Sequence, residues 1–317
     1  MVTDWTERFR ADLTALVGLP SGPIAVAVSG GPDSMALLSL AHATAPTIAA
    51  TVDHRLRAAS AAEARMVADW CAAAGVPHTT LVPPDGWAPQ SIQADARVLR
   101  YALLTDWAKT NGATVLLTAH HADDQAETFL MRAGRGSGVT GLGGIRALRD
   151  ERGVTLARPL LGWRRAELRA FAEAQGLPFV DDPSNADPRF DRVRMRDWLS
   201  DAPIEARAVA QSAAACAEAA AALDAMADLM VTERRRGDGW DMTGLPREVR
   251  RRLARRAILD VRTARPCEGR FDPATNVEGL LDALYAGEKA TIAGVLACSQ
   301  GQIWHFRPAP PRRSDRV

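Results

Sequence analysis

Short apolar runs alternate with longer helical patterns through the first half of the chain. Four runs have the length and composition of buried strands, at Ile24–Val28, Thr47–Val52, His78–Val82 and Thr114–Thr118. Helical patterns follow them at about Asp33–His42, Ala58–Ala74, Gln90–Thr110 and Asp123–Arg132. Strands that alternate with helices in this way indicate βαβ units, so they predict an α/β fold with a doubly wound parallel sheet.

The second half of the chain is mostly helical in pattern. A helix near Arg164–Gln175 precedes an almost unbroken alanine-rich helix from Ile204 to about Arg236. Further elements are expected near Pro246–Val261, Thr275–Tyr285 and, as a strand, Gln302–Phe306. We therefore expect a first domain over residues 1–203, a long helical linker over 204–236 and a smaller C-terminal domain over 237–317.

Composition narrows the class of protein. The chain has 317 residues, 47% of them apolar, and a formal net charge of +1, which is typical of a folded globular protein. With a net charge so near zero, a surface that binds nucleic acid has to be local. Only Lys109 and Lys289 of the 39 basic residues are lysines, so arginine clusters also arise here from composition alone.

The four cysteines, Cys71, Cys216, Cys267 and Cys298, are far apart in the sequence. They include no C-x-x-C pair, and in a chain of this length they do not suggest a disulfide framework. The N-terminal residues carry several charges and no apolar signal region, and no stretch is apolar enough to span a membrane. We expect a cytoplasmic protein without a membrane partner.

A glycine-containing loop follows the first predicted strand. Its residues are Ser29, Gly30, Gly31, Pro32, Asp33 and Ser34. Two glycines allow the backbone N–H groups to approach an anion, and the next helix directs its positive end to the same place. A lone Gly-Gly here would more often be a solvent-filled turn, but the full string in this position favours a phosphate-binding loop.

This loop lacks the lysine of a Walker A motif and instead carries a carboxylate, Asp33. A carboxylate beside phosphate implies that a cation lies between them, and Mg²⁺ is commonly held by carboxylate and phosphate oxygens. We therefore expect Asp33 to bind Mg²⁺. The string resembles the S-G-G-x-D-S loop of the ATP pyrophosphatases, which cleave ATP between the α- and β-phosphates and adenylate a substrate.

A second polar cluster follows the fourth predicted strand and contains His120, His121, Asp123, Asp124 and Glu127. Such a group could hold a metal, bind a basic substrate or cap the start of a helix. Capping explains one or two of the acids but not the whole group. Zinc is disfavoured, because the cluster has neither a cysteine pair nor H-x-x-x-H spacing.

Several motifs occur in a fixed order and together resemble one family. They are Ser29–Ser34, Val52–Arg57, Ala96-Arg97 through Arg100-Tyr101, His120–Thr128, Arg135–Gly138 and Asp182–Asp187. In this order they are similar to the tRNA(Ile)-lysidine synthetase family, over about residues 24–196. The resemblance implies an adenine nucleotide α-hydrolase-like fold.

That resemblance also implies a two-step reaction on a tRNA(Ile) with a CAU anticodon. ATP adenylates the 2-carbonyl oxygen of the wobble cytidine and releases pyrophosphate; the amine of free L-lysine then displaces AMP and forms lysidine. Two other functions remain as alternatives: a tRNA thiolase built on the same loop, and an inactive RNA- or nucleotide-binding module. The sequence leaves a homodimer open.

The resemblance further implies roles for individual residues. Asp33 would hold Mg²⁺ on the pyrophosphate, while Arg97 and Arg100 would stabilise the transferring α-phosphate unless they are part of a solvated helix face. His120 would lie near the RNA backbone or the adenylated base. Asp124 and Glu127 would bind the lysine cation, and one of them would accept a proton from its amine.

Two arginine series are candidates for RNA contact. The first is Arg192, Arg194 and Arg196, in which Val193 stands where the family usually has asparagine; a plain solvated face is the alternative. The second lies between Leu245 and Arg270, a segment with nine arginines and three acidic residues. From it we select Arg251, Arg252 and Arg255 as candidate RNA contacts. Chance clustering in an arginine-rich chain is the alternative there.

Overall fold

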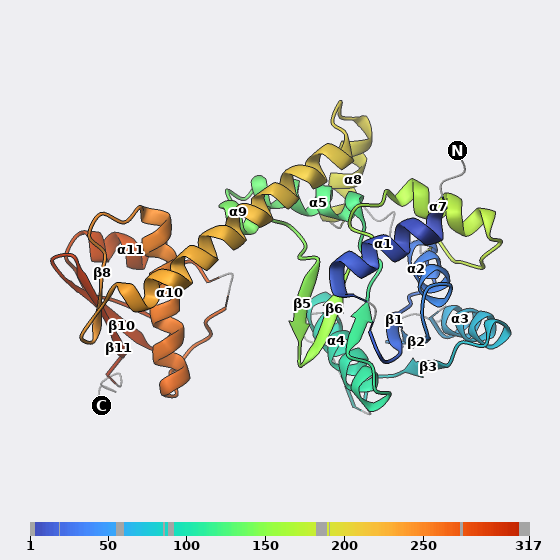
Figure 1. Cartoon of the computed structure of the whole chain (residues 1–317), viewed down its shortest axis with the longest axis horizontal. Helices are drawn as coiled ribbons and strands as arrows, with labels where there is room; N and C mark the ends of the chain where they lie inside the picture. Colours follow the sequence, from blue (N-terminus) through green and yellow to red (C-terminus); the bar gives the residue numbers. More distant parts are fainter. Residues whose placement is uncertain are drawn as a thin grey trace. The chain divides into compact units, whose positions relative to one another are not determined.

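The computed structural model describes residues 4–18, 20–54, 60–84, 86–87, 92–181, 189, 191–272 and 275–310. It contains two compact units, Met1–Ala217 and Glu218–Val317, and the division between them falls inside one long helix, α9 (Ala206–Glu233). Figure 1 shows the elements of both units.

The first unit is built on a six-stranded sheet with the order β3-β2-β1-β4-β6-β5. Four of its strands are those the sequence predicts: β1 (Ile24–Ala27), β2 (Thr47–Val52), β3 (His78–Leu81) and β4 (Val115–Leu117). They pair in parallel, and β6 (Val154–Ala157) adds to β4 in the same direction. The predicted doubly wound parallel sheet is therefore confirmed.

Helices cover both faces of this sheet. On one face, the core joins strand residues such as Val26 and Leu117 to α1 (Trp5–Val17), α2 (Pro32–His42), α3 (Ser60–Ala74) and α7 (Arg165–Ala174). On the other face, Leu104 and Trp107 of α4 (Ile92–Thr110) pack on Ala25 and Leu116. This two-sided packing explains why the strands are nearly continuous apolar runs.

Several elements of the first unit were not predicted. Helix α1 begins at an Asp4 N-cap that accepts hydrogen bonds from the N–H groups of Thr6 and Glu7, and it buries Phe9 and Leu13 among exposed charges. Strand β5 (Leu148–Glu151) pairs antiparallel with β6 across a two-residue turn in which Arg152 and Gly153 both have positive φ. That turn needs left-handed backbone at both positions, for which Arg-Gly is an uncommon signal.

A separate group of helices lies beyond the carboxyl end of β4. It contains α5 (Ala122–Ala133), the short α6 (Val139–Leu142), α8 (Asp191–Asp201) and the first half of α9. Ala126 of α5 packs with Ala206 and Val209 of α9, and Leu199 of α8 completes this small core. The group holds α5 in place above the sheet edge.

The glycine-rich segment after α5 is fixed to that helix. The Arg132 guanidinium donates to the carbonyls of Gly141 and Gly144 at 2.7 and 2.8 Å, and the Gln125 amide exchanges two hydrogen bonds with the Ile145 backbone. These bonds hold the segment against the side of α5.

The second unit is a five-stranded antiparallel sheet with the order β7-β8-β11-β10-β9, packed against helices. The strands are β7 (Arg235–Arg236), β8 (Gly239–Asp241), β9 (Ala290–Ile292), β10 (Val295–Gln300) and β11 (Ile303–Pro308). Only β11 was predicted. Leu253 of α10 (Arg247–Ala264), Leu281 of α11 (Glu278–Tyr285) and Ala227 of α9 share its core with Trp304. None of the helices in the described residues combines the length and apolarity that crossing a bilayer requires.

Candidate active site

The Ser29–Ser34 loop connects β1 to α2 in a closed conformation. Gly30 has φ +86°, a left-handed conformation that favours glycine, and Gly31 is the N-cap of α2 with Pro32 in its first turn. The Ser34 hydroxyl accepts from the Ser29 N–H at 3.1 Å and donates to the Gly31 carbonyl at 3.0 Å. The loop is therefore shaped by its own side chains, and the helix N-terminus faces the same space.

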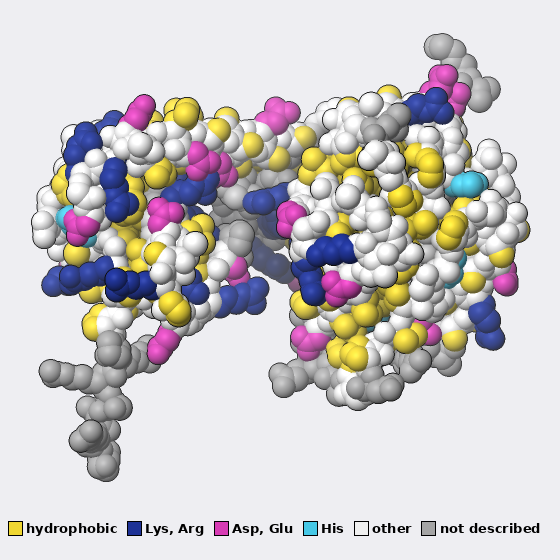
Figure 2. All heavy atoms as spheres, turned by 60° about the horizontal axis from the view of Figure 1, so that its bottom comes forward, with side chains coloured by type: hydrophobic (Ala, Val, Ile, Leu, Met, Phe, Trp, Pro, Cys, Tyr) yellow, Lys and Arg dark blue, Asp and Glu magenta, His cyan; other side chains and the backbone are white. Residues whose placement is uncertain are grey.

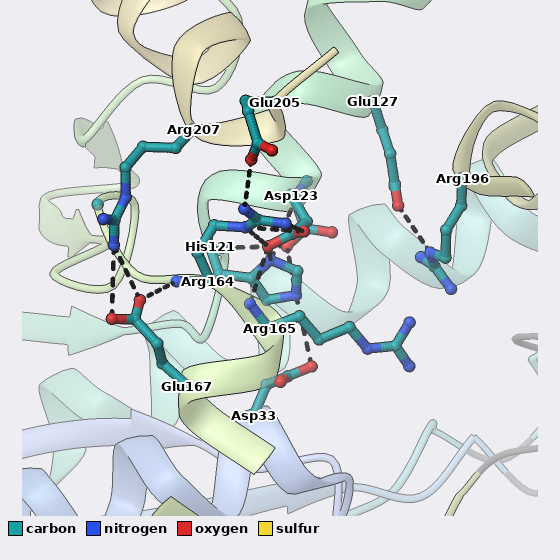
Figure 3. Close-up of polar contacts among 12 residues, drawn as sticks. Asp33, His121, Asp123, Glu127, Arg164, Arg165, Glu167, Arg196, Glu205 and Arg207 are labelled. Carbon is teal, nitrogen blue, oxygen red and sulfur yellow. Dashed lines mark hydrogen bonds and ion pairs between the residues drawn. The ribbon is translucent and has the colours of Figure 1, made fainter. Parts of the chain in front are cut away.

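Asp33 stands in the first turn of α2 and its carboxylate is directed at His121 (Figure 3). The Oδ2 atom lies 3.5 Å from His121 Nε2, whereas Oδ1 is buried and has no hydrogen-bond partner among the described residues. A buried carboxylate oxygen without a donor is costly unless a ligand satisfies it. Its chemistry suits a hard cation such as Mg²⁺.

His121 is the N-cap of α5 and stands among three carboxylates. The Asp124 N–H donates to His121 Nδ1 at 3.3 Å, and Asp124 Oδ2 accepts from the His121 N–H at 3.1 Å. Asp33 and Asp123 flank the ring at 3.5 and 3.7 Å. Burial lowers the pKa of His121, but Asp124, Asp33 and Asp123 together outweigh it, so the pKa is raised.

The carboxylates of Asp123 and Asp124 contact different residues. Both oxygens of Asp123 accept from the Arg164 guanidinium at 3.0–3.2 Å, and the Arg165 N–H donates to it at 2.8 Å (Figure 3). Asp124 instead faces His121 and the inner site. Burial would raise the pKa of Asp124, but His121 and His120 hold it below its usual range. Asp124 is therefore an anion at neutral pH.

Glu127 lies one turn further along α5 and is almost fully buried. Its Oε1 accepts from Arg196 Nε of α8 at 2.7 Å (Figure 3), while Oε2 is buried and lacks a hydrogen-bond partner among the described residues. Burial raises the pKa of this carboxyl, and Arg196 offsets only part of the rise. Predicted as an RNA contact, Arg196 here forms an ion pair inside the site.

His120 belongs to a different environment from its neighbour. Its Nδ1 lies 3.0 Å from the Thr118 hydroxyl and accepts from Arg158 Nε at 3.3 Å. Burial is the main cause that lowers the pKa of His120, to about 3, with Arg158, Arg97 and Arg192 acting in the same direction. The ring is therefore neutral at physiological pH.

The remaining predicted arginines of the first unit differ in their contacts. Arg97 lies over the Tyr101 ring, with its guanidinium carbon 5.0 Å from the ring centroid. Arg100 Nε is 3.4 Å from His54 Nε2. Arg192 is exposed and acts electrostatically on His120, Asp124 and Glu127. Arg194 pairs with Asp191 on its own helix. Arg192 and Arg196 of α8 thus act on the carboxylate cluster, whereas Arg97 of α4 acts on His120.

The three arginines selected in the second unit are engaged within that unit. Arg252 is only 4% exposed and pairs with Asp224 and Glu248, while Arg251 pairs with Glu248 and Glu278. Arg255 donates to the carbonyls of Thr275 and Asp272. Dark-blue and magenta side chains are accordingly interspersed over this unit in Figure 2. The structure gives these arginines structural contacts, and their binding to RNA stays a prediction.

Two of the sequence motifs lie at least partly outside the described residues, namely Arg55–Arg57 and Asp182–Asp187. The sequence also did not reveal two arginines that contact the His120–Glu127 segment in the folded chain. Arg158 and Arg164 come from β6 and the start of α7, far from the motif they contact. Arg158 follows a strand that was not predicted, so nothing in the local pattern marked it as part of the sheet edge.

The chain is similar in sequence to proteins of one family. Residues 6–202 match the family model described as a PP-loop domain. A tRNA(Ile)-lysidine synthase of Novosphingobium aromaticivorans is 44% identical over 98% of this chain and 95% of its own length. One of Zymomonas mobilis is 40% identical over 96% and 94%, and one of Ruegeria pomeroyi is 41% identical over 96% and 74%.

Among solved structures, a U34-tRNA thiolase, NcsA, from Methanococcus maripaludis aligns with a TM-score of 0.55 at 17% sequence identity. The alignment covers 68% of this chain and 78% of that one, and at this identity it supports the fold of the first unit. The sequence relatives are far more similar and extend through both units. The chain belongs to the tRNA(Ile)-lysidine synthase family, and its first unit is a PP-loop domain.

Proposed function

We propose that this chain ligates free L-lysine to the wobble cytidine of a tRNA(Ile) with a CAU anticodon, using ATP and forming lysidine. One observation supports this most directly. His121 contacts both Asp33 of the phosphate loop and Asp124 of α5, and Glu127 lies one turn further along the same helix. A phosphate-binding loop beside acidic groups suits a reaction in which a nucleotide activates a base for attack by a cationic amine.

In the first step the 2-carbonyl oxygen of the cytidine attacks the α-phosphorus of ATP. The O–P bond forms as the bond to the β,γ-pyrophosphate breaks. Backbone N–H groups of the Ser29–Ser34 loop, among them those of Gly30 and Gly31, bind the leaving group, and Arg97 and Arg100 stabilise charge on the α-phosphate. Asp33 would hold Mg²⁺ through its unpartnered Oδ1, and the ion would supply charge for the departing pyrophosphate.

In the second step the lysine side-chain amine attacks C2 of the adenylated base. The C–N bond forms and the bond from C2 to the AMP oxygen breaks. The ammonium has to lose a proton first, because only the neutral amine carries a lone pair. Asp124, an anion at neutral pH, binds the ammonium, and Glu127, whose pKa is raised by burial, is the better proton acceptor.

The function is tested by incubating the purified chain with ATP, labelled lysine and total tRNA. We expect label in a single tRNA species, AMP and pyrophosphate in equal amounts, and loss of all three products in Asp33→Asn. Asp106→Asn is the matched control, since Asp106 is exposed on α4 and pairs only with Arg152 among the described residues. Sulfur transfer without lysine transfer would indicate a thiolase, and RNA binding without AMP release an inactive module.

We assign catalysis to residues 1–203 and further RNA contact to residues 237–317, with the cytoplasm as the site of action. None of the four cysteines lies in the Ser29–Ser34 loop or in the His120–Glu127 segment, so nothing at this site favours thiolase chemistry. A homodimer is the assembly we propose to test, by light scattering on the purified chain.

A further inference from the structure

Arg158 is a buried cation that forms no ion pair with any carboxylate among the described residues. It follows β6 and is only 3% exposed. Its Nε donates to His120 Nδ1 at 3.3 Å and its Nη1 to the Arg146 carbonyl at 2.5 Å, and both acceptors are neutral. Within the described ranges no carboxylate forms an ion pair with it. Burial is the main cause that lowers its pKa, and Tyr101, acting in the opposite direction, does not balance it.

This arrangement is unfavourable for stability alone. A guanidinium stays protonated in proteins, and the hydrogen bonds of Arg158 to His120, Tyr101 and the Arg146 carbonyl all go to neutral groups, so among the described residues no anion balances its buried charge. Arg252 shows how the same chain handles a structural buried arginine: it pairs with both Asp224 and Glu248. The charge of Arg158 is therefore available to an anion that the chain itself does not supply.

More positive charge surrounds the same place. Arg97 and Arg192 both act on His120, and neither forms an ion pair with another described residue. Arg97 and Arg149 each lie about 5 Å from the Tyr101 ring centroid, although Arg149 also pairs with Glu151. His120 is neutral, so it adds no competing cation and its Nδ1 holds the Arg158 guanidinium in position.

The location ties this group to the proposed reaction. His120 and Arg158 follow β4 and β6, which are neighbours in the sheet, and His120 lies within electrostatic range of Asp124. The arginine group and the acidic cluster thus meet at one edge of the sheet. Charge extending from Arg158 to exposed Arg192 suits a polyanion better than a single small anion.

We propose that Arg158, with Arg192 at its rim, forms an oxyanion site that binds a phosphodiester of the substrate RNA next to the base being modified. A planar guanidinium can donate two parallel hydrogen bonds to phosphate oxygens, which fixes orientation as well as affinity. The inference rests on the proposed function and adds a residue to its RNA-binding site.

The test compares Arg158→Met with Arg10→Met, a control on an exposed arginine of α1. Binding of the tRNA is measured at several salt concentrations, and the KM values for ATP and lysine are measured separately. In Arg158→Met we expect a roughly tenfold weaker tRNA affinity and a salt dependence reduced by about one phosphate contact, with both KM values unchanged. The control should match the unaltered chain in every measurement.

If Arg158 binds an anion other than an RNA phosphate, the same measurements give different results, and these would overturn the proposal. If the site held the lysine carboxylate, the KM for lysine would rise, while 1,5-diaminopentane would be used equally by both proteins. If it held an ATP phosphate, ATP binding measured without RNA would weaken.

Should Arg158→Met fold poorly, Arg192→Met changes only an exposed side chain and should still weaken tRNA binding several-fold. Unchanged binding in that variant would count against the site. If the unaltered chain does not transfer lysine to tRNA, the proposed function is wrong. If it does transfer lysine, but both variants bind tRNA as tightly as the unaltered chain, only the oxyanion site is wrong.

Discussion

The Glu127 carboxylate and the Arg196 guanidinium form an ion pair 2.7 Å long that joins α5 to α8. Glu127 is 1% exposed, so this pair keeps a charged group inside the protein next to the proposed lysine site. Removing one member of such a pair leaves the other buried and uncompensated.

We therefore predict that Arg196→Met lowers the free energy of unfolding by about 2–3 kcal/mol at pH 8, measured by urea denaturation. The loss should be smaller at pH 5. Without Arg196 the folded-state pKa of Glu127 rises further above its unfolded value, so protonation at low pH relieves the buried charge. Arg194→Met on the same helix, which removes an exposed pair, is the control. An equal loss at both pH values would contradict this account.

His120 predicts a distinct pH dependence of stability. Its folded-state pKa of about 3 lies below the ordinary value of 6.5, so between these values the unfolded chain binds more protons. Stability due to this residue is complete above about pH 6.5 and is lost as the pH falls toward 3, by up to about 1.4 kcal/mol per pH unit. His120→Asn should flatten this part of the stability curve.

The measurement for His120 is the difference in unfolding free energy between the unaltered chain and His120→Asn at pH 7, 6 and 5. His121 works in the opposite direction, since its raised pKa contributes stability that is lost as the pH rises. It is present in both proteins, so the difference isolates His120. Parallel curves over this range would contradict a neutral buried ring.

Substitution of Gly144 tests how firmly the glycine-rich segment after α5 is held against that helix. Its φ is +66°, and a Cβ atom there would lie 2.3 Å from Gln125 Oε1, inside the amide contact with Ile145. We expect Gly144→Ala to cost about 2–3 kcal/mol of stability and to open the segment to limited proteolysis. Gly138→Ala has φ −73° and open space around it, so it should change neither measurement.

Substitution of Arg252 tests whether this arginine stabilises the second unit or binds RNA. Arg252→Met should lower stability by about 3 kcal/mol, because Asp224 and Glu248 lose a buried partner, and the salt dependence of tRNA binding in the same variant tests its predicted contact with RNA. Arg265→Met, on an exposed side chain, is the matched control for stability. A shallower salt dependence with unchanged stability in Arg252→Met would instead place this residue on the RNA.

The sequence predicted the parallel sheet well, because its strands are buried on both faces and their apolar runs are bounded by clear turn residues. It did not predict β5 and β6, whose turn at Arg152-Gly153 depends on backbone angles rather than on a familiar residue pair. The antiparallel strands of the second unit were also missed, because several are only two or three residues long and their pairing is set by tertiary packing.

At the site, the sequence identified the loop and the acidic cluster but could not assign partners. Asp123 and Glu127 are four residues apart, and the fold turns one toward Arg164 and the other toward Arg196. Likewise His120 and His121 are adjacent, yet one ring is neutral and the other stands among carboxylates. Such differences depend on side chains that arrive from distant parts of the chain.

Helix α9 supplies apolar side chains to both units without a glycine or proline anywhere along its length. A fragment that ends just before Ala206 would expose Ala126 and Leu199 to solvent. A fragment that begins after Ala227 would lose a residue from the core around Trp304. Any attempt to express either half separately therefore has to include part of this helix.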